Sequence, residues 1–140
     1  MATFNKLNSF AAYLPNAGVN LASDSVKCML TNTAPVATNT TYSSISANEL
    51  ASGAGYTTGG ASATLTSSTQ TSGTYKFITA LASPTWTSSG SMGPFRYVVL
   101  YDSTTGVLIG WWDYGSSLTL TSGQTFTVAL DPTNGVFQLS

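Results

Sequence analysis

The chain has 140 residues with 42% hydrophobic side chains, 6% charged side chains and a net charge of -1, which argues against a disordered chain and fits one domain over residues 1–140. Its four basic residues are dispersed, which argues against nucleic acid as a partner, and its single cysteine excludes an internal disulfide. No apolar run approaches the roughly 20 residues that a membrane-spanning helix needs, so we expect no membrane anchor.

The first 23 residues are predicted to form a short helix followed by an arm. Over residues 4–14, apolar side chains recur at spacings of three and four, which is the pattern of one face of an amphipathic helix. Pro15 and Gly18 then predict the end of that helix.

The next segment combines one strand with a second short helix. Apolar and polar side chains alternate over residues 26–30, which predicts a half-buried strand that ends before Pro35. Ser46 and Glu49 have the spacing of a capping box. In this motif the serine oxygen accepts the N–H of the glutamate, and the glutamate carboxylate accepts the N–H of the serine. One short helix is therefore expected in the 43–52 region.

The segment GAGYTTGG, residues 53–60, has the glycine content of a phosphate-binding loop. It precedes a predicted strand instead of following one, and it opens no helix, so the dinucleotide-binding fingerprint fails on its context. We interpret these glycines as positions that require a positive φ in a tight loop.

From residue 61 onward, short alternating segments are separated by turn residues. The turn DSTTG begins with Asp102, which predicts an Asx turn, and DPTNG begins with Asp131, which we interpret as a turn residue. Residues 67–73 are predicted as a hairpin loop. The sequence therefore predicts an all-β protein: an antiparallel β-sandwich or barrel of about eight short strands over residues 24–140. The predicted strands of this part are 63–65, 75–81, a run around Trp86, 95–102, 107–114, 118–120, 126–130 and 136–139.

Catalytic chemistry finds little support in the sequence. The chain has no histidine, no G-x-S-x-G nucleophile elbow and no calcium-loop motif. Of the five carboxylates, only Asp24 and Asp113 lack a predicted role in a turn or a cap. We therefore predict that the protein is not an enzyme, with no catalytic residue, no cofactor and no metal ligand.

The adjacent tryptophans of GWWDYG, residues 110–115, raise a packing question. Successive side chains of a strand point to opposite faces, so Trp111 and Trp112 cannot enter the same core. The more regular apolar stripe contains Trp111, which places Trp112 and Tyr114 on the outer face as a candidate interface. Three interpretations stay open: the pair stacks on a sugar ring, another subunit buries it, or a second sheet or the N-terminal helix of the same chain covers it.

Five segments of the chain are distinctive: FNKLNSF, VKCMLTNTAPVATNT, NELASGAGYTTGG, GPFRYVVLYD and LIGWWDYGSSLTLTSGQTFTV. With these segments the chain resembles a group of small virion proteins encoded by tailed bacteriophages. The resemblance implies a structural protein of the phage particle without catalytic residues, most simply a head decoration (cement) protein, with a tail or fibre component as the alternative. A small lectin-like carbohydrate-binding module would fit the composition equally well.

The resemblance also sets the expected partners and location. A decoration protein would bind the major capsid protein or other virion proteins, and it would be found in the virion after synthesis in the host bacterial cytoplasm. The low charge of the chain gives weak repulsion between copies, so we also expect a homo-oligomer.

Overall fold

A computed structural model describes residues 2–63, 67–78, 83–131, 133 and 135–139. In these residues the chain forms antiparallel strands, one short α-helix and two 3-10 turns, which confirms the all-β prediction. The elements in chain order are β1 (Phe4–Lys6), α1 (Phe10–Tyr13), β2 (Val26–Thr31), η1 (Tyr42–Ser44), η2 (Ser46–Asn48), β3 (Ala61–Ala63), β4 (Ser67–Thr71), β5 (Thr74–Ile78), β6 (Thr85–Thr87), β7 (Met92–Asp102), β8 (Leu108–Leu120), β9 (Thr125–Thr127) and β10 (Phe137–Leu139).

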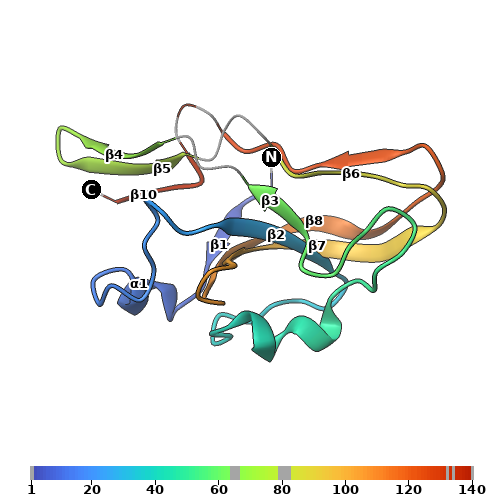
Figure 1. Ribbon diagram of the computed structural model, residues 1–140, viewed down its shortest axis with the longest axis horizontal. Helices are drawn as coiled ribbons and strands as arrows, with labels where there is room; N and C mark the ends of the chain where they lie inside the picture. The colour runs from blue at the N-terminus through green and yellow to red at the C-terminus, as the bar shows by residue number, and fades with distance from the viewer. Residues whose placement is uncertain (1, 64–66, 79–82, 132, 134, 140) are drawn as a thin grey trace.

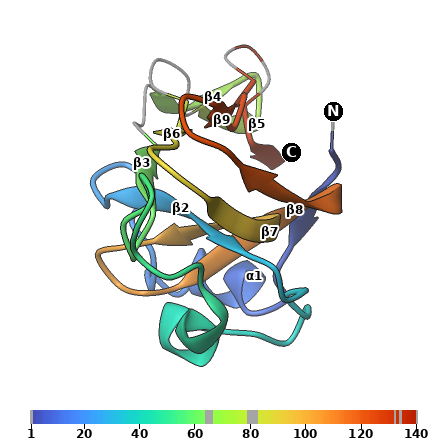
Figure 2. The same cartoon turned by 90° about the vertical axis from the view of Figure 1, so that its right-hand side faces the viewer.

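A five-stranded sheet in the order β1-β8-β7-β2-β3 forms the centre of the structure. Two smaller sheets, β10-β5-β4 and β6-β9, lie on one side of it, while η1 and η2 lie on the other side (Figures 1 and 2). Strand β6 precedes β7 and strand β9 follows β8 in the chain, and the β6-β9 pair folds back over β7 and β8. Backbone bonds at this fold join Ser88 to Gln124 and Gly123 to Ser88, each 2.8 Å long.

Apolar side chains pack on both faces of the central sheet, because successive side chains of its long strands point to opposite faces and are apolar on both. On β7, Val98 and Leu100 join the larger core beneath the smaller sheets, whereas Val99 and Tyr101 join a smaller core on the opposite face. Cys28 is fully buried in the larger core, where it serves as a packing residue.

The predicted helix over residues 4–14 is largely wrong. Only Phe10–Tyr13 is helical, and Phe4–Lys6 instead form β1, which pairs with β8 so that Phe4 lies opposite Trp112. The two rings pack with their centroids 5.0 Å apart. Gly110 makes room for this contact, since a Cβ atom there would lie 2.3 Å from Cζ of Phe4. Long-range pairing with β8 therefore overrides the local helical spacing.

The helix expected in the 43–52 region consists of the two 3-10 turns η1 and η2, and the predicted capping box does not form. The Ser46 hydroxyl donates to the carbonyl oxygen of Ser43 at 3.5 Å, the N–H of Glu49 donates to the backbone carbonyl oxygen of Ser46 at 3.1 Å, and Glu49 is extended at the end of η2. The Glu49 carboxylate points instead at two tyrosine hydroxyls and a glycine N–H. These stronger, charge-assisted partners explain why the cap is not used.

Several other strand boundaries differ from prediction. The predicted strand 95–102 begins earlier, at Met92, and only the first part of the predicted strand 126–130 lies in β9. The predicted loop over residues 67–73 contains β4, and the predicted strands 107–114 and 118–120 are joined in β8. Parts of the strands predicted at 63–65 and 75–81 lie outside the described residues.

The predicted turn chemistry is confirmed. Oδ1 of Asp102 accepts the N–H groups of Thr104 and Thr105, and Oδ1 of Asp131 accepts that of Thr133 at 2.8 Å. In the segment 53–60 all four glycines have a positive φ. Gly60, at +75°, also approaches the carbonyl oxygen of Cys28 too closely to carry a Cβ atom.

Candidate functional site

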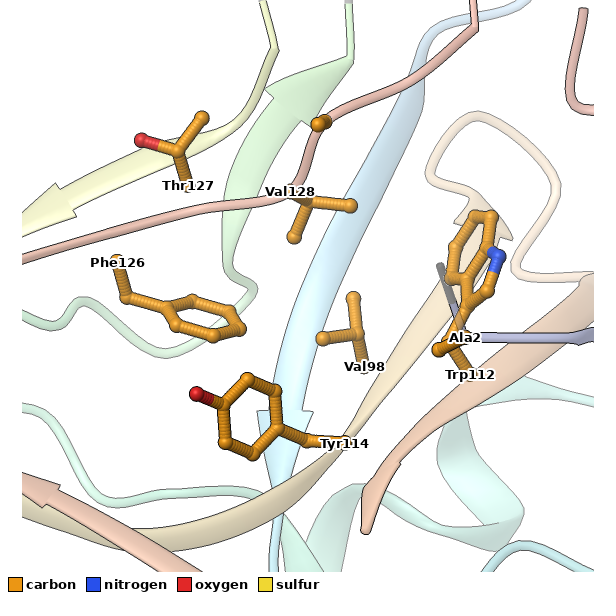
Figure 3. A pocket seen from close by; sticks show the side chains of 8 residues that line it. Ala2, Val98, Trp112, Tyr114, Phe126, Thr127 and Val128 are labelled. Carbon is orange, nitrogen blue, oxygen red and sulfur yellow. The ribbon is translucent and has the colours of Figure 1, made fainter.

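An apolar hollow of about 170 Å³ opens between the central sheet and the β6-β9 pair. Both Trp112 and Tyr114, the residues predicted from the sequence as a candidate interface, line this hollow. Figure 3 shows the rings of Tyr114 and Phe126 on one side, Trp112 on the other and Val98 between them. The lining residues are Ala2, Val98, Trp112, Tyr114, Phe126, Thr127, Val128 and Ala129.

Ring contacts fix the aromatic walls of the hollow. Tyr114 and Phe126 meet edge to face, with centroids 5.8 Å apart, and Phe126 meets the buried Phe95 at 4.9 Å in the same manner. On the other side, Trp112 is held by Phe4 of β1. The hollow is therefore built from rings whose positions are set by the fold and not by a ligand.

The two tryptophans do point to opposite faces, but their assignment from the sequence was reversed. Trp111 packs against the smaller core, and Trp112 packs against the larger one. The cause is a register shift in β8: Tyr101 pairs with Leu108 and Leu100 with Gly110, so Ile109 is an extra residue. A β-bulge of one residue moves every later side chain to the other face.

The hollow suits apolar contact better than acid–base chemistry. Tyr114 is 55% exposed and is one of two large hydrophobic side chains that are exposed among the described residues. The hydroxyl of Thr127 already pairs with that of Thr85 at 2.9 Å. The arrangement can therefore receive an apolar side chain or a flat ring, with the Tyr114 hydroxyl available as a hydrogen-bonding group.

A second cluster, which the sequence analysis missed, surrounds the carboxylate of Glu49. The carboxylate accepts hydrogen bonds from the hydroxyl of Tyr42, from the hydroxyl of Tyr56 at 2.5 Å and from the N–H of Gly59 at 2.7 Å. Tyr56 in turn accepts the N–H of Leu30 at 3.1 Å. These bonds anchor the chain between β2 and β3 to the central sheet.

The tyrosines around Glu49 stay protonated over a wide pH range. Burial, followed by the hydrogen bond to Glu49, raises the pKa of both Tyr42 and Tyr56. Burial also raises the pKa of Tyr101 to about 12, and its hydroxyl donates to the carbonyl oxygen of Gly59 at 2.7 Å. The hydroxyls are thus fixed as donors, which gives the cluster a structural role.

The ionisable residues Asp113 and Cys28 also have structural surroundings. Asp113 accepts two bonds from the guanidinium of Arg96, at 2.7 and 2.9 Å, and one from the N–H of Gly115 at 2.8 Å. The Arg96 bonds, with the Gly115 N–H second, lower the pKa of Asp113. Burial raises the pKa of the Cys28 thiol to about 12.

Among the described residues, no three His, Cys, Asp or Glu side chains are grouped as a metal site would require. None of the helices in this part of the chain has the length and apolar character needed to cross a membrane. Comparisons of the chain with protein-family models, with curated proteins and with solved structures found no match. The resemblance to phage virion proteins therefore stays a prediction from the sequence.

Proposed function

We propose that this protein is a structural component of a tailed-bacteriophage particle, most simply a decoration protein that binds the assembled head lattice. The observation that carries the proposal is the apolar hollow with Tyr114 exposed at its rim. In this proposal the hollow receives an apolar side chain of the major capsid protein, and the lattice is stabilised by the contacts that result.

The aromatic residues of the hollow have the properties of an interface anchor. Tyrosine and tryptophan dominate binding hot spots because a rigid ring buries a large area at a small cost in entropy. Tyr114 already has one ring edge against Phe126, so its position is set before a partner binds. A preorganised apolar site of this kind favours binding to a protein surface.

Charge and sequence add support. The chain carries only nine charged side chains, and repulsion between neighbouring copies on a lattice is correspondingly weak. The carboxylates of Glu49 and Asp113 are engaged by donors of the same chain, so they stabilise the fold. The sequence segments that resemble phage virion proteins include the strand that carries Trp112 and Tyr114.

The proposal is tested by binding to phage heads assembled without this protein. Wild-type protein should bind the heads, and Tyr114→Ala should weaken binding by about 30-fold or more, the scale of an interface hot spot. Val36→Ala is the matched control, because Val36 is 54% exposed and lies away from the hollow, and it should bind within about twofold of wild type. Absence of binding by the wild type, or equal binding by Tyr114→Ala, would contradict the proposal.

A carbohydrate-binding module is the second candidate, and the exposed ring of Tyr114 beside Trp112 favours it. Sugar rings stack on such aromatic faces. A glycan array separates the two functions: a decoration protein binds heads and no glycan, whereas a lectin binds a glycan and loses this binding in Tyr114→Ala. A reconstruction of the intact particle then distinguishes the head from the tail or fibre and shows whether copies of the chain form a homo-oligomer.

A further inference from the structure

A groove of about 280 Å³ lies between the N-terminal segment and β10. Figure 1 shows β10 above α1 at the left of the view, and the rings of Phe10 in α1 and Phe137 in β10 meet edge to face, with their centroids 5.3 Å apart. Of the described residues that line this groove, none also lines the hollow. The groove is therefore a separate site, and what it binds does not depend on the function proposed above.

Phenylalanine rings make the floor of the groove apolar. Phe4 stacks on Phe137 with ring centroids 6.4 Å apart, and Leu14 and Pro15 add aliphatic surface. Phe4 also packs against Trp112 of β8 with centroids 5.0 Å apart. The rings are thus held by contacts within the chain, so the groove is formed before a ligand binds.

Among the described residues that line the groove, Lys6 is the only charged one. It lies two residues after Phe4 on β1, so both side chains point to the same face of the strand. In the described part of the chain the only salt bridge joins Arg96 to Asp113, so no carboxylate neutralises the Lys6 ammonium. Lys6 is exposed, and a lysine at such a rim lays its stem on apolar surface while its ammonium stays in water. The groove therefore combines an apolar floor with one uncompensated positive charge.

We propose that the groove binds a small apolar monocarboxylate, whose apolar body lies on the phenylalanine rings and whose carboxylate pairs with the Lys6 ammonium. A single lysine matches a single negative charge, whereas a phosphate monoester would bring a second charge without a partner. The volume fits a body of about eight carbons, because a cavity of about 150 Å³ already holds a benzene ring and the groove is nearly twice as large. Burial of the apolar body and one charge-assisted hydrogen bond both favour binding.

Lys6 has one other role that the fold suggests. Strand β1 is the outer strand of the central sheet, and a lysine that points inward on an edge strand hinders pairing with a strand of another molecule. That role requires neither an apolar groove beside the lysine nor a ligand. The two roles therefore predict different results in a binding experiment.

Isothermal titration calorimetry with octanoate tests the site. Octanoate should bind the wild type with a Kd of about 1 mM or tighter, the range expected for so small a ligand. Octan-1-ol, which has the same chain length and no charge, should bind about fivefold more weakly, the upper end of what one exposed ion pair contributes. This preference should shrink in high salt. Absence of saturable octanoate binding up to about 10 mM, or equal binding of the two ligands, would overturn the proposal.

Two pairs of variants locate the site. Lys6→Gln should lower the affinity for octanoate to that for octan-1-ol. Lys27→Gln, the matched control, should leave it unchanged, because Lys27 lies opposite Tyr101, whose side chain packs on the other face of the central sheet. Ala11→Phe fills the groove and should weaken binding of both ligands by about tenfold or more, whereas Ala12→Phe, at a residue that does not line the groove, should not. Ala11 and Ala12 are both exposed, so neither change disturbs the core.

The contrary outcomes are equally specific. Wild-type affinity of octanoate for Ala11→Phe would place the ligand elsewhere on the protein and overturn the proposal. An equal loss in Lys6→Gln and Lys27→Gln would reduce the effect of Lys6 to the net charge and overturn its pairing with the carboxylate. Ring resonances of Phe10 and Phe137 in the wild type decide the question should a variant fail to fold: they should shift on addition of octanoate, and unchanged resonances would overturn the site.

Discussion

Removing one hydroxyl at the Glu49 cluster should have a large effect on stability. Tyr56 is buried, donates to Glu49 at 2.5 Å and accepts from the N–H of Leu30 at 3.1 Å. Tyr56→Phe therefore loses a hydrogen bond to a charged group, worth about 1.5–3 kcal/mol, and leaves a buried backbone donor unsatisfied. We expect a loss of about 3 kcal/mol in the free energy of unfolding, which is a large part of the roughly 5–15 kcal/mol typical of a domain.

Urea denaturation followed by tryptophan fluorescence measures this loss as a lower midpoint with an unchanged slope. Tyr114→Phe is the matched control, because it removes a hydroxyl from a ring that is 55% exposed, and surface changes of this kind stay within about 0.5 kcal/mol. Glu49→Gln keeps the size of the side chain but removes the charge, and its effect should not add to that of Tyr56→Phe, since both act on one network. A Tyr56→Phe protein as stable as the wild type would show that the cluster does not anchor the segment between β2 and β3.

Three other outcomes follow from the packing and the charges. Gly110→Ala should cost about 1–3 kcal/mol and speed amide exchange in β1, because the new Cβ atom would lie 2.3 Å from the ring of Phe4; unchanged exchange would contradict this close fit. Cys28 should resist thiol reagents at pH 8 until the protein is unfolded, since it is fully buried with a pKa of about 12. The stabilisation from Asp113 should be present above its unfolded pKa, be lost as the pH falls through its lowered folded pKa, and weaken in high salt, as titrations with and without salt can measure.

The parts of the fold that could be predicted from the sequence depend on local chemistry. Alternation along β7 predicts a strand with two apolar faces, and the structure places a core on each. The Asx turns at Asp102 and Asp131 need only an aspartate and the two or three residues that follow it.

The parts that could not be predicted depend on partners far along the chain. The helical spacing around Phe4 is present in the sequence. The Phe4 ring nevertheless packs against Trp112 and into the space above Gly110, more than a hundred residues away in the chain. Ser46 and Glu49 have the spacing of a capping box, yet the Glu49 carboxylate binds stronger donors, the hydroxyls of the tyrosines on either side of it in the sequence. No periodic pattern links those tyrosines to Glu49, because each is brought to it by a different turn of the chain.

The bulge at Ile109 connects the sequence question about the two tryptophans to the hollow. Strict alternation from Leu108 would place Trp112 and Tyr114 on the face of the smaller core, and the extra residue moves both to the face covered by the β6-β9 pair. There Trp112 meets Phe4, and Tyr114 meets Phe126 at the rim of the hollow.

Trp112→Ala should therefore cost about 2–3 kcal/mol of monomer stability, less than the roughly 3–5 kcal/mol of a fully buried large ring because Trp112 is only half-buried. Tyr114→Ala should leave monomer stability nearly unchanged and weaken only binding. If thermal melting showed the reverse order, the hollow would be a strained part of the core and not a surface prepared for a partner.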